Sequence, residues 1–169
     1  MFVSKELSFT SKFNRYSFFN IKEELHKFVQ ENNLKNGFMV VQSVHTTCSV
    51  FFEEFVHDTD DMGYEYLQKD LIKGLNKVFP KQVLYDDYYA YPGPNHRKKS
   101  NEEFECFREN PAILLNADAH LKASILGSSV TIIIKEGKMQ TGDFGDIYFV
   151  DWDSNRSRER KCIVAFLGE

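Results

Sequence analysis

The stretch Asn116-Ala-Asp-Ala-His120-Leu-Lys-Ala-Ser-Ile-Leu-Gly127-Ser-Ser129 places an amide, a carboxylate and an imidazole within five residues, just before an apolar turn that ends at Gly127. A segment that only filled a core would rarely carry three such groups where a helix starts, because each needs a hydrogen-bond partner when buried. The β-branched run 129–135 follows directly. The stretch therefore predicts a helix that leads into a strand and carries a site at its start.

Around this stretch the chain alternates between short β-patterned runs and two further amphipathic helices. The expected strands are Val3 to Thr10, Tyr16 to Phe19, Phe38 to Val44, Ser49 to Glu53, Ser129 to Lys135, Ile147 to Trp152 and Arg160 to Leu167. One helix runs from Ile21 with Asn20 as its N-cap, and the longest spans Leu67 to Val78 and stops before Pro80. The last three strands read as an antiparallel meander.

These elements predict an α+β protein, a compact single domain over residues 1–169 with a mainly antiparallel sheet and about three helices. The segment from Pro80 to Pro111 has no period and is long for a connection. Because it is rich in Tyr and Phe, we expect it to be ordered and to pack on the protein or on a neighbouring subunit.

Composition and charge exclude several classes of protein. The formal net charge of −4 argues against a general nucleic-acid binder, which would need clustered Lys and Arg for phosphate contacts. Three cysteines without CxxC spacing favour reduced thiols. No signal peptide and no apolar run of roughly 18 residues is found, so no membrane association is expected. We expect a soluble cytoplasmic protein.

The relative placement of Asn116, Asp118 and His120 depends on where their helix begins. If the whole segment is helical, Asn116 and His120 share one face at i and i+4, while Asp118 points roughly opposite to His120. If the helix begins at about residue 117 or 118, Asp118 lies in the entry turn and can cap the helix or hold a ligand. A functional His120 and a satisfied buried histidine are both open.

A second polar cluster, His45-Thr46-Thr47, follows a buried strand, where sites of α+β proteins often take their polar groups. In the plainer alternative, the two threonines satisfy a bend and His45 packs. Glu53 and Glu54 come one strand later, and a carboxylate near an imidazole can orient a general base or join a metal site. Paired surface glutamates are the commoner case.

A metal and an anion are two further hypotheses. His96, in the Pro-Gly-Pro-Asn-His-Arg-Lys-Lys loop, can swing in to complete a metal site with His45 and His120, leaving water as an open ligand. No local motif ties these histidines together. Arg156, Arg158 and Arg160 alternate after a turn, which is typical either of a phosphate grip or of edge protection on an exposed strand. Of the three, Arg158 is assigned to ligand binding.

Taken in order, several segments resemble the YjbQ-like family, often described as secondary thiamine-phosphate synthases. They are His45-Thr-Thr-Cys48 with Glu54, Asn116-Ala-Asp-Ala-His120-Leu-Lys-Ala, Leu126-Gly-Ser-Ser129-Val and the final Arg-rich strand. The tract Gly63 to Leu71 and the loop Tyr91-Pro-Gly-Pro-Asn-His96 resemble a subgroup of that family. The chain departs from the family at Gly142-Asp-Phe-Gly145 and at Glu53, which makes the neighbourhood more acidic.

The resemblance implies packed β layers, a homotrimer with clefts between subunits, and a polar pocket. Its implied members are His45, Thr46, Thr47, Glu54, Asn116, Asp118 and His120, with His96 nearby and with a divalent metal, zinc or magnesium. It also implies a weak or secondary thiamine-phosphate synthase activity on a phosphorylated or heterocyclic small molecule, a transferase reaction. Two alternatives stay open: a trimeric protein that binds a small ligand or metal without turnover, and a metal-assisted hydrolase.

Overall fold

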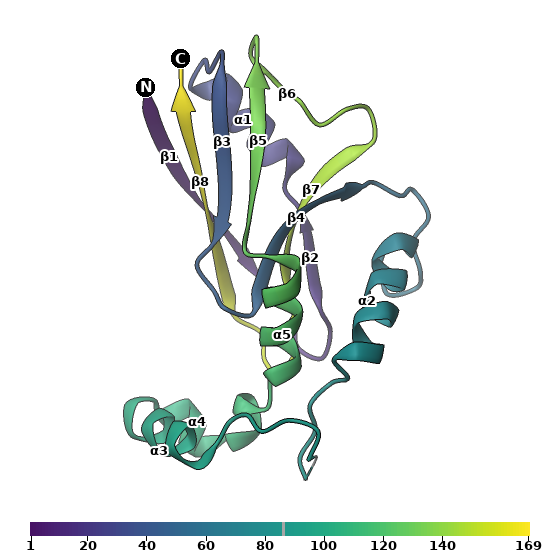
Figure 1. Cartoon of the computed structure of the whole chain (residues 1–169), viewed down its shortest axis with the longest axis vertical. Helices are drawn as coiled ribbons and strands as arrows, with labels where there is room; N and C mark the ends of the chain where they lie inside the picture. The colour runs from purple at the N-terminus through teal and green to yellow at the C-terminus, as the bar shows by residue number, and fades with distance from the viewer. Residues whose placement is uncertain (86) are drawn as a thin grey trace.

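The computed structural model describes residues 1–85 and 87–169, and Asp86, inside the expected 80–111 connection, lies outside them. Within this part of the chain eight strands form two antiparallel sheets (Figure 1). The first sheet has the order β1 (Phe2–Thr10), β8 (Glu159–Gly168), β3 (Gly37–Ser43), β5 (Ser129–Lys135) and β6 (Lys138–Met139). The second has the order β2 (Ser17–Asn20), β7 (Gly145–Asp151) and β4 (Cys48–Glu54).

The main core lies between the two sheets, and helix α1 (Lys22–Glu31) closes it at the end near the two termini (Figure 1). Inward-facing side chains of both sheets, such as Met39, Val164 and Phe149, meet Leu25 and Phe28 of the helix there. The apolar spacing expected from Ile21 onward is thereby confirmed. Asn20 accepts the backbone N–H of Lys22 at 3.1 Å and so supports the helix start, although Ile21 occupies the N-cap position.

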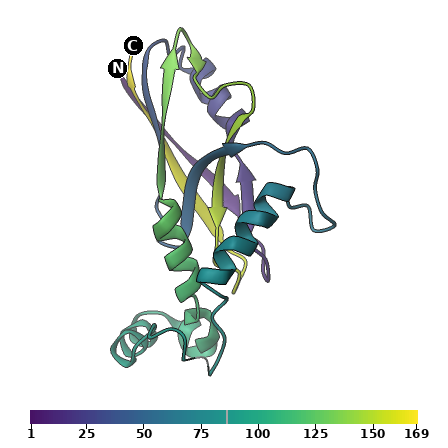
Figure 2. The same cartoon turned by 45° about the vertical axis from the view of Figure 1, so that its right-hand side comes forward.

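A second core covers the other face of the three-stranded sheet. Helices α5 (Ala117–Leu126) and α2 (Tyr66–Val78) both lie on this side of the sheet (Figure 2). Tyr148 and Val150 of β7 belong to this core, together with Trp152 directly after the strand, and β7 is buried on both faces. As expected, α2 is the longest helix among the described residues, and none of these helices is long and apolar enough to span a membrane.

Three expectations need correction, although the α+β class and the antiparallel sheets are confirmed. The last three long strands do not form a meander, because β5 and β8 both flank β3 while β7 belongs to the other sheet. The 80–111 segment contains α3 (Pro94–Glu103) and α4 (Glu105–Glu109), and a 3₁₀ helix, η1 (Pro111–Leu114), follows. The described chain therefore has five α-helices instead of about three.

The missed helix α3 carries almost no apolar periodicity. Its sequence is polar, and Ser100 is its one buried residue. Pro94 stands at the first helical position, where its fixed φ suits a helix start. A helix without an apolar stripe cannot be predicted from hydrophobic periodicity, because that periodicity arises from the face that packs against a core.

Candidate functional site

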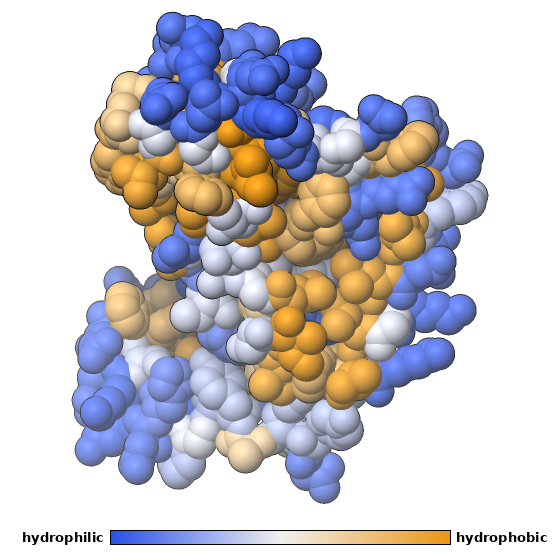
Figure 3. Space-filling model, turned by 45° about the horizontal axis from the view of Figure 1, so that its top comes forward, coloured by the Kyte–Doolittle hydropathy of each residue, from blue (hydrophilic) through white to orange (hydrophobic). Residues whose placement is uncertain are grey.

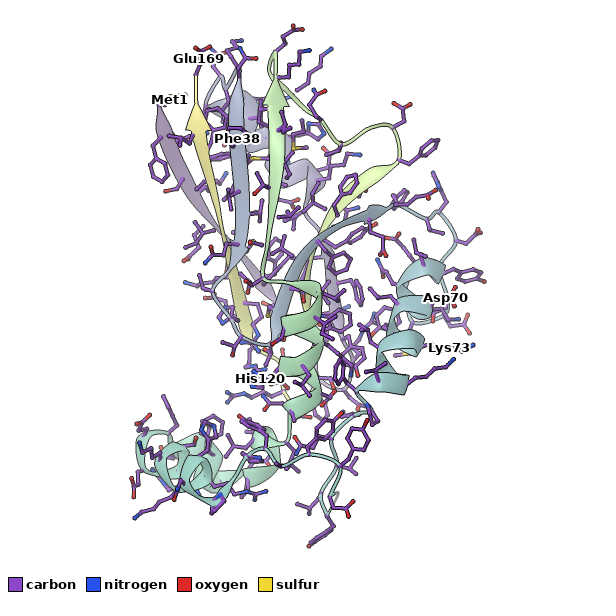
Figure 4. All side chains as sticks on the ribbon, in the orientation of Figure 1. Met1, Phe38, Asp70, Lys73, His120 and Glu169 are labelled. Carbon is purple, nitrogen blue, oxygen red and sulfur yellow. The ribbon has the colours of Figure 1, made fainter. Side chains whose placement is uncertain are left out.

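A cavity of about 410 Å³ lies where the chain leaving β3, the start of α5 and the helices α3 and α4 meet. Its polar lining comes from His45, Thr46, Thr47, His96, Ser100, Glu103, Asn116, His120, Arg158 and Arg160. Its apolar lining comes from Val44, Tyr91, Phe104, Phe107, Ile113 and Leu114. Figure 4 shows His120 on the turns of α5 that face these two helices. The size suits a small molecule.

His45 is held between the backbone and a guanidinium group. Its Nε2 atom accepts the backbone N–H of Lys161 at 2.9 Å, and its Nδ1 atom lies 3.4 Å from Nη1 of Arg160. Burial lowers the pKa of His45, and the charge of Arg160 lowers it further. The imidazole is therefore neutral at pH 7, with its Nε2 lone pair already used.

His120 is the freer of the two imidazoles. Burial lowers its pKa, and a hydrogen bond between the ring and the Thr46 backbone only partly opposes this effect. The ring of Tyr91 stands edge-on to it with centroids 5.5 Å apart, and the Tyr91 hydroxyl lies 3.2 Å from Nε2 of His96. His45, His96 and His120 thus all line one cavity.

Two ion pairs, Arg160 with Asp151 and Arg158 with Asp153, form the floor of the site. Asp151 accepts Nε of Arg160 at 2.7 Å, and Thr47 lies against both groups. Asp153 meets Nη2 of Arg158 at 2.5 Å. Burial by itself would raise the pKa of Asp153, but Arg158 and the surrounding donors outweigh it and lower that pKa. The carboxylate of Asp153 is therefore ionised in the fold.

Arg160 departs from its expected role. The alternation of Arg156, Arg158 and Arg160 was compatible with an exposed, solubilising strand face, yet Arg160 is buried. Arg156 points elsewhere, with Nη1 3.3 Å from the Cys106 sulfur. Arg158 lines the cavity, which is where a ligand-binding residue would have to lie.

Glu54 and Asp118 are not brought to this cavity within one chain. Glu54 lies at the far end of β4 from His45 and pairs with Gly145, so the carboxylate acting on His45 is that of Asp151. Asp118 is buried within α5 and accepts Nζ of Lys122 at 2.8 Å. The helix begins at Ala117, so Asp118 lies in the entry turn, as in the second alternative. Its carboxylate there accepts from Lys122 and from the backbone N–H of Gln82.

The donor set does not fit a three-histidine metal centre. Among residues 1–85 and 87–169, no three His, Cys, Asp or Glu side chains are gathered closely enough to hold an ion. The Nε2 lone pair of His45 already accepts a backbone N–H, and the cation of Arg160 faces its other ring nitrogen. A metal ligand needs a free lone pair. The divalent metal therefore stays a prediction.

Sequence reasoning missed Asp151, Asp153 and Tyr91 as site residues. A signal was available for the first two. Asp151 and Asp153 precede the turn at the same two-residue spacing with which Arg158 and Arg160 follow it, so the chain reads as two complementary pairs across a turn. Tyr91 gave no such signal, because its contact with His120 joins distant parts of the chain.

Stability is expected to fall as the pH drops below 6.5, the ordinary pKa of histidine. The folded pKa values of His45 and His120 are lowered, so the unfolded chain takes up protons first and gains stability relative to the fold. Urea unfolding at about pH 7.5 and about pH 5.5 measures the difference. His120→Gln should reduce the fall, whereas substitution of the exposed His57 should not. A free energy of unfolding that is equal at the two pH values, or higher at the lower pH, contradicts the expectation.

The fold and the cavity define a class of protein: two packed antiparallel sheets with a polar cavity beside the helix that begins after Asn116 and carries His120. The family model described as UPF0047 protein YjbQ-like matches residues 5–169, and the chain belongs to that family. The UPF0047 protein YugU of Bacillus subtilis is 24% identical over 149 residues, which cover 88% of each chain. The UPF0047 protein MJ1081 of Methanocaldococcus jannaschii is 28% identical over 131 residues, 78% of this chain and 72% of that one.

Solved structures agree with the fold. A YjbQ/UPF0047 family protein from Clostridium acetobutylicum superposes with a TM-score of 0.66 at 28% identity, covering 95% of this chain and 99% of the other. A YbjQ-like protein of unknown function from Sulfolobus solfataricus P2 gives a TM-score of 0.68 over the whole of both chains. At 22% identity, this second likeness bears on the fold alone.

Proposed function

We propose that the chain is an enzyme of the YjbQ-like family that acts on a phosphorylated or heterocyclic small molecule, with a weak or secondary thiamine-phosphate synthase activity. The observation that carries this proposal is the placement of His120, a partly buried imidazole with a lowered pKa that opens into the cavity. A neutral imidazole can accept a proton or polarise a substrate by a hydrogen bond.

In the proposed transfer a thiazole nitrogen forms a bond to the methylene carbon of an aminopyrimidine diphosphate, the carbon–oxygen bond breaks, and pyrophosphate leaves with the electron pair. The chain's own residues would bind and orient the two substrates. In this arrangement His120 contacts the reacting atoms of the substrates. Arg158 and Asn116 contact their polar groups, and Phe104 and Phe107 contact the flat faces of their rings.

Binding without turnover is the alternative that a specific observation favours. Both nitrogens of His45 already face protein donors, so this residue positions the loop and contributes no free acid or base. A metal-assisted hydrolase would need an open coordination position, and the histidines do not provide a fitting donor set in one chain.

His120→Ala is expected to abolish thiamine phosphate formation, because this imidazole lines the cavity and is the group proposed to accept a proton or polarise the substrate. Purified protein would be assayed with both substrates, with and without added zinc or magnesium, and the product quantified by mass spectrometry. His26→Ala, on helix α1 away from the cavity, is the control. If the unmodified protein forms no product under any of these conditions, the synthase proposal is wrong, and ligand-induced thermal stabilisation would then favour the binding protein.

We further propose that the chain forms a homotrimer, and the outer face of the five-stranded sheet supports this. Register places Phe2, Leu167, Phe38 and Ile133 in one row across four strands, and their exposed fractions range from 54% to 68%. Hydrophobic side chains occupy broad areas of the surface in Figure 3. Contiguous apolar patches on proteins usually mark contacts with other molecules.

Phe38→Glu is expected to dissociate the assembly, because it places a charge in the middle of this apolar row (Figure 4). Light scattering after size-exclusion chromatography would measure the mass, which should fall from three chains to one. Lys35→Glu, outside the strand, serves as the control. A trimer unaffected by Phe38→Glu would place the interface on another surface.

A further inference from the structure

The formal charges on the cavity floor cancel. The guanidinium groups of Arg158 and Arg160 are each paired with a buried aspartate, at 2.5 and 2.7 Å, and the imidazoles of His45 and His120 have lowered pKa values. No excess positive charge therefore faces the middle of the cavity from these residues. A site built for a fully charged anion would normally supply unpaired cations.

Unpaired hydrogen-bonding atoms remain in this floor, on Asn116 and Arg158. Oδ1 of Asn116 has no partner, and neither Nε nor Nη2 of Arg158 has a well-directed hydrogen bond, although Nη2 is in ionic contact with Asp153. Asn116 is 9% exposed, so its amide oxygen is also shielded from bulk water. Buried polar atoms without partners cost free energy and usually mark the place of a water or ligand.

Asp153 orients the side chains of Asn116 and Arg158. Nδ2 of Asn116 donates to Oδ2 of Asp153 at 2.8 Å, and Nη2 of Arg158 approaches the same oxygen. The carboxylate requires the NH₂ group of the amide, so the amide oxygen must be the atom left free. The free acceptor of Asn116 and the free donor Nε of Arg158 thus belong to two groups that are anchored on one oxygen atom and that both line the cavity.

We propose that Asn116 and Arg158 form a subsite for an uncharged planar group that carries a hydrogen-bond donor next to an acceptor. A carboxamide, a lactam or the amidine-type edge of a nitrogen heterocycle has this pattern. Its N–H donates to Oδ1 of Asn116, and its oxygen or ring nitrogen accepts from Nε of Arg158. This inference rests on the proposed function and assigns the subsite to the heterocyclic part of the substrate instead of its phosphate.

The apolar rim fits the same ligand. Phe104 and Phe107 line the cavity and pack edge-on, with centroids 5.7 Å apart, and Tyr91 closes another side beside His120. Aromatic rings offer flat apolar faces to a planar ligand. An anion at this point would instead meet the acceptor oxygen of Asn116, and the cation of Arg158 beside it is already paired with Asp153.

The test compares nicotinamide with nicotinate, which share one ring and differ in an amide against a carboxylate. Saturation-transfer NMR titrations of the full chain, with inorganic phosphate as a third probe, give the dissociation constants. Nicotinamide should bind at least about tenfold more tightly than nicotinate, because only the amide matches both free atoms. Equal or tighter binding of nicotinate or phosphate, or no binding of nicotinamide, overturns the proposal.

Two variants locate the binding. Arg158→Lys keeps a cation for Asp153 but lacks Nε, and Asn116→Ala removes the acceptor, so each should abolish the preference for the amide. Arg15→Lys, whose guanidinium lies over Tyr64 outside the cavity, should bind as the unmodified chain does. Thermal unfolding checks that each variant is folded. Unchanged nicotinamide binding in folded Arg158→Lys would refute the subsite.

The two proposals fail separately. Selective nicotinamide binding without thiamine phosphate formation would keep the subsite and remove the synthase, whereas product formation without selective binding would do the opposite.

Discussion

Asp151→Asn is expected to lower the free energy of unfolding by about 3–5 kcal/mol, the usual loss when one partner of a buried ion pair is neutralised. Asp151 is fully buried and accepts from Arg160, from Thr47 and from the backbone N–H of Asp153. The neutral amide would leave the guanidinium of Arg160 in the interior without a counter-charge. Urea unfolding followed by circular dichroism measures the change.

Asp70→Asn is the matched control, because Asp70 is exposed on α2 (Figure 4) and such surface changes usually stay within about 0.5 kcal/mol. Asp151→Asn combined with Arg160→Met removes the charge as well as its partner and should recover part of the loss. If Asp151→Asn alone is as stable as the unmodified chain, the Asp151–Arg160 pair does not stabilise the cavity floor.

The sequence predicted the elements of the fold better than their pairing. Each β-patterned run became a strand, because alternation or a buried apolar run reports directly on the two faces of a strand. The meander was wrong because nothing in the three runs says that β7 belongs to the other sheet. Sheet membership depends on contacts between distant segments, such as Phe149 with Val50 of β4, which a local pattern does not contain.

The site was predictable in part for the same reason. Asn116 and His120 were expected to share a helical face only if the whole segment was helical; Asn116 instead precedes the helix, and both residues line the cavity. Asp118 was expected to reach the site only from an entry turn; it lies in the first turn of α5 but does not line the cavity. The contact of Tyr91 with His120 could not be predicted, since it joins residues far apart in sequence. The pairing of Asp151 with Arg160 lies within one turn region, and its spacing was a signal that the sequence reasoning did not use.

Asp118 has a structural connection to the cavity even though it does not line it. It accepts the backbone N–H of Gln82 at 3.2 Å, and the side chain of Gln82 donates to the carbonyl oxygen of Tyr91. The same side chain accepts the backbone N–H of Ala117 at 2.8 Å. The start of α5 is thereby joined to the segment that places Tyr91 against His120, so Asp118 is a positioning residue in this fold.

Lys122→Met is expected to cost about 3–5 kcal/mol of unfolding free energy, because it leaves the carboxylate of Asp118 buried without its cation. The lysine side chain is fully buried, with Nζ 2.8 Å from both Asp118 and the Tyr16 hydroxyl. Burial lowers the pKa of Lys122, and the hydrogen bond and charge of Asp118 oppose that shift. The length of the side chain is kept in methionine, so the effect reports on charge and hydrogen bonding.

Lys73→Met, on the exposed face of α2 (Figure 4), is the control for a lysine-to-methionine change and should alter stability by no more than about 0.5 kcal/mol. Asp118→Asn combined with Lys122→Met should be more stable than Lys122→Met alone, because the uncompensated charge is gone. Nicotinamide titration of the same variants extends the measurement to the cavity. Because Asp118 positions Tyr91 through Gln82, Lys122→Met should weaken binding while leaving the amide preference intact. If Lys122→Met lost the preference for nicotinamide over nicotinate but kept its stability, Asp118 would not act on the cavity through Gln82 and Tyr91.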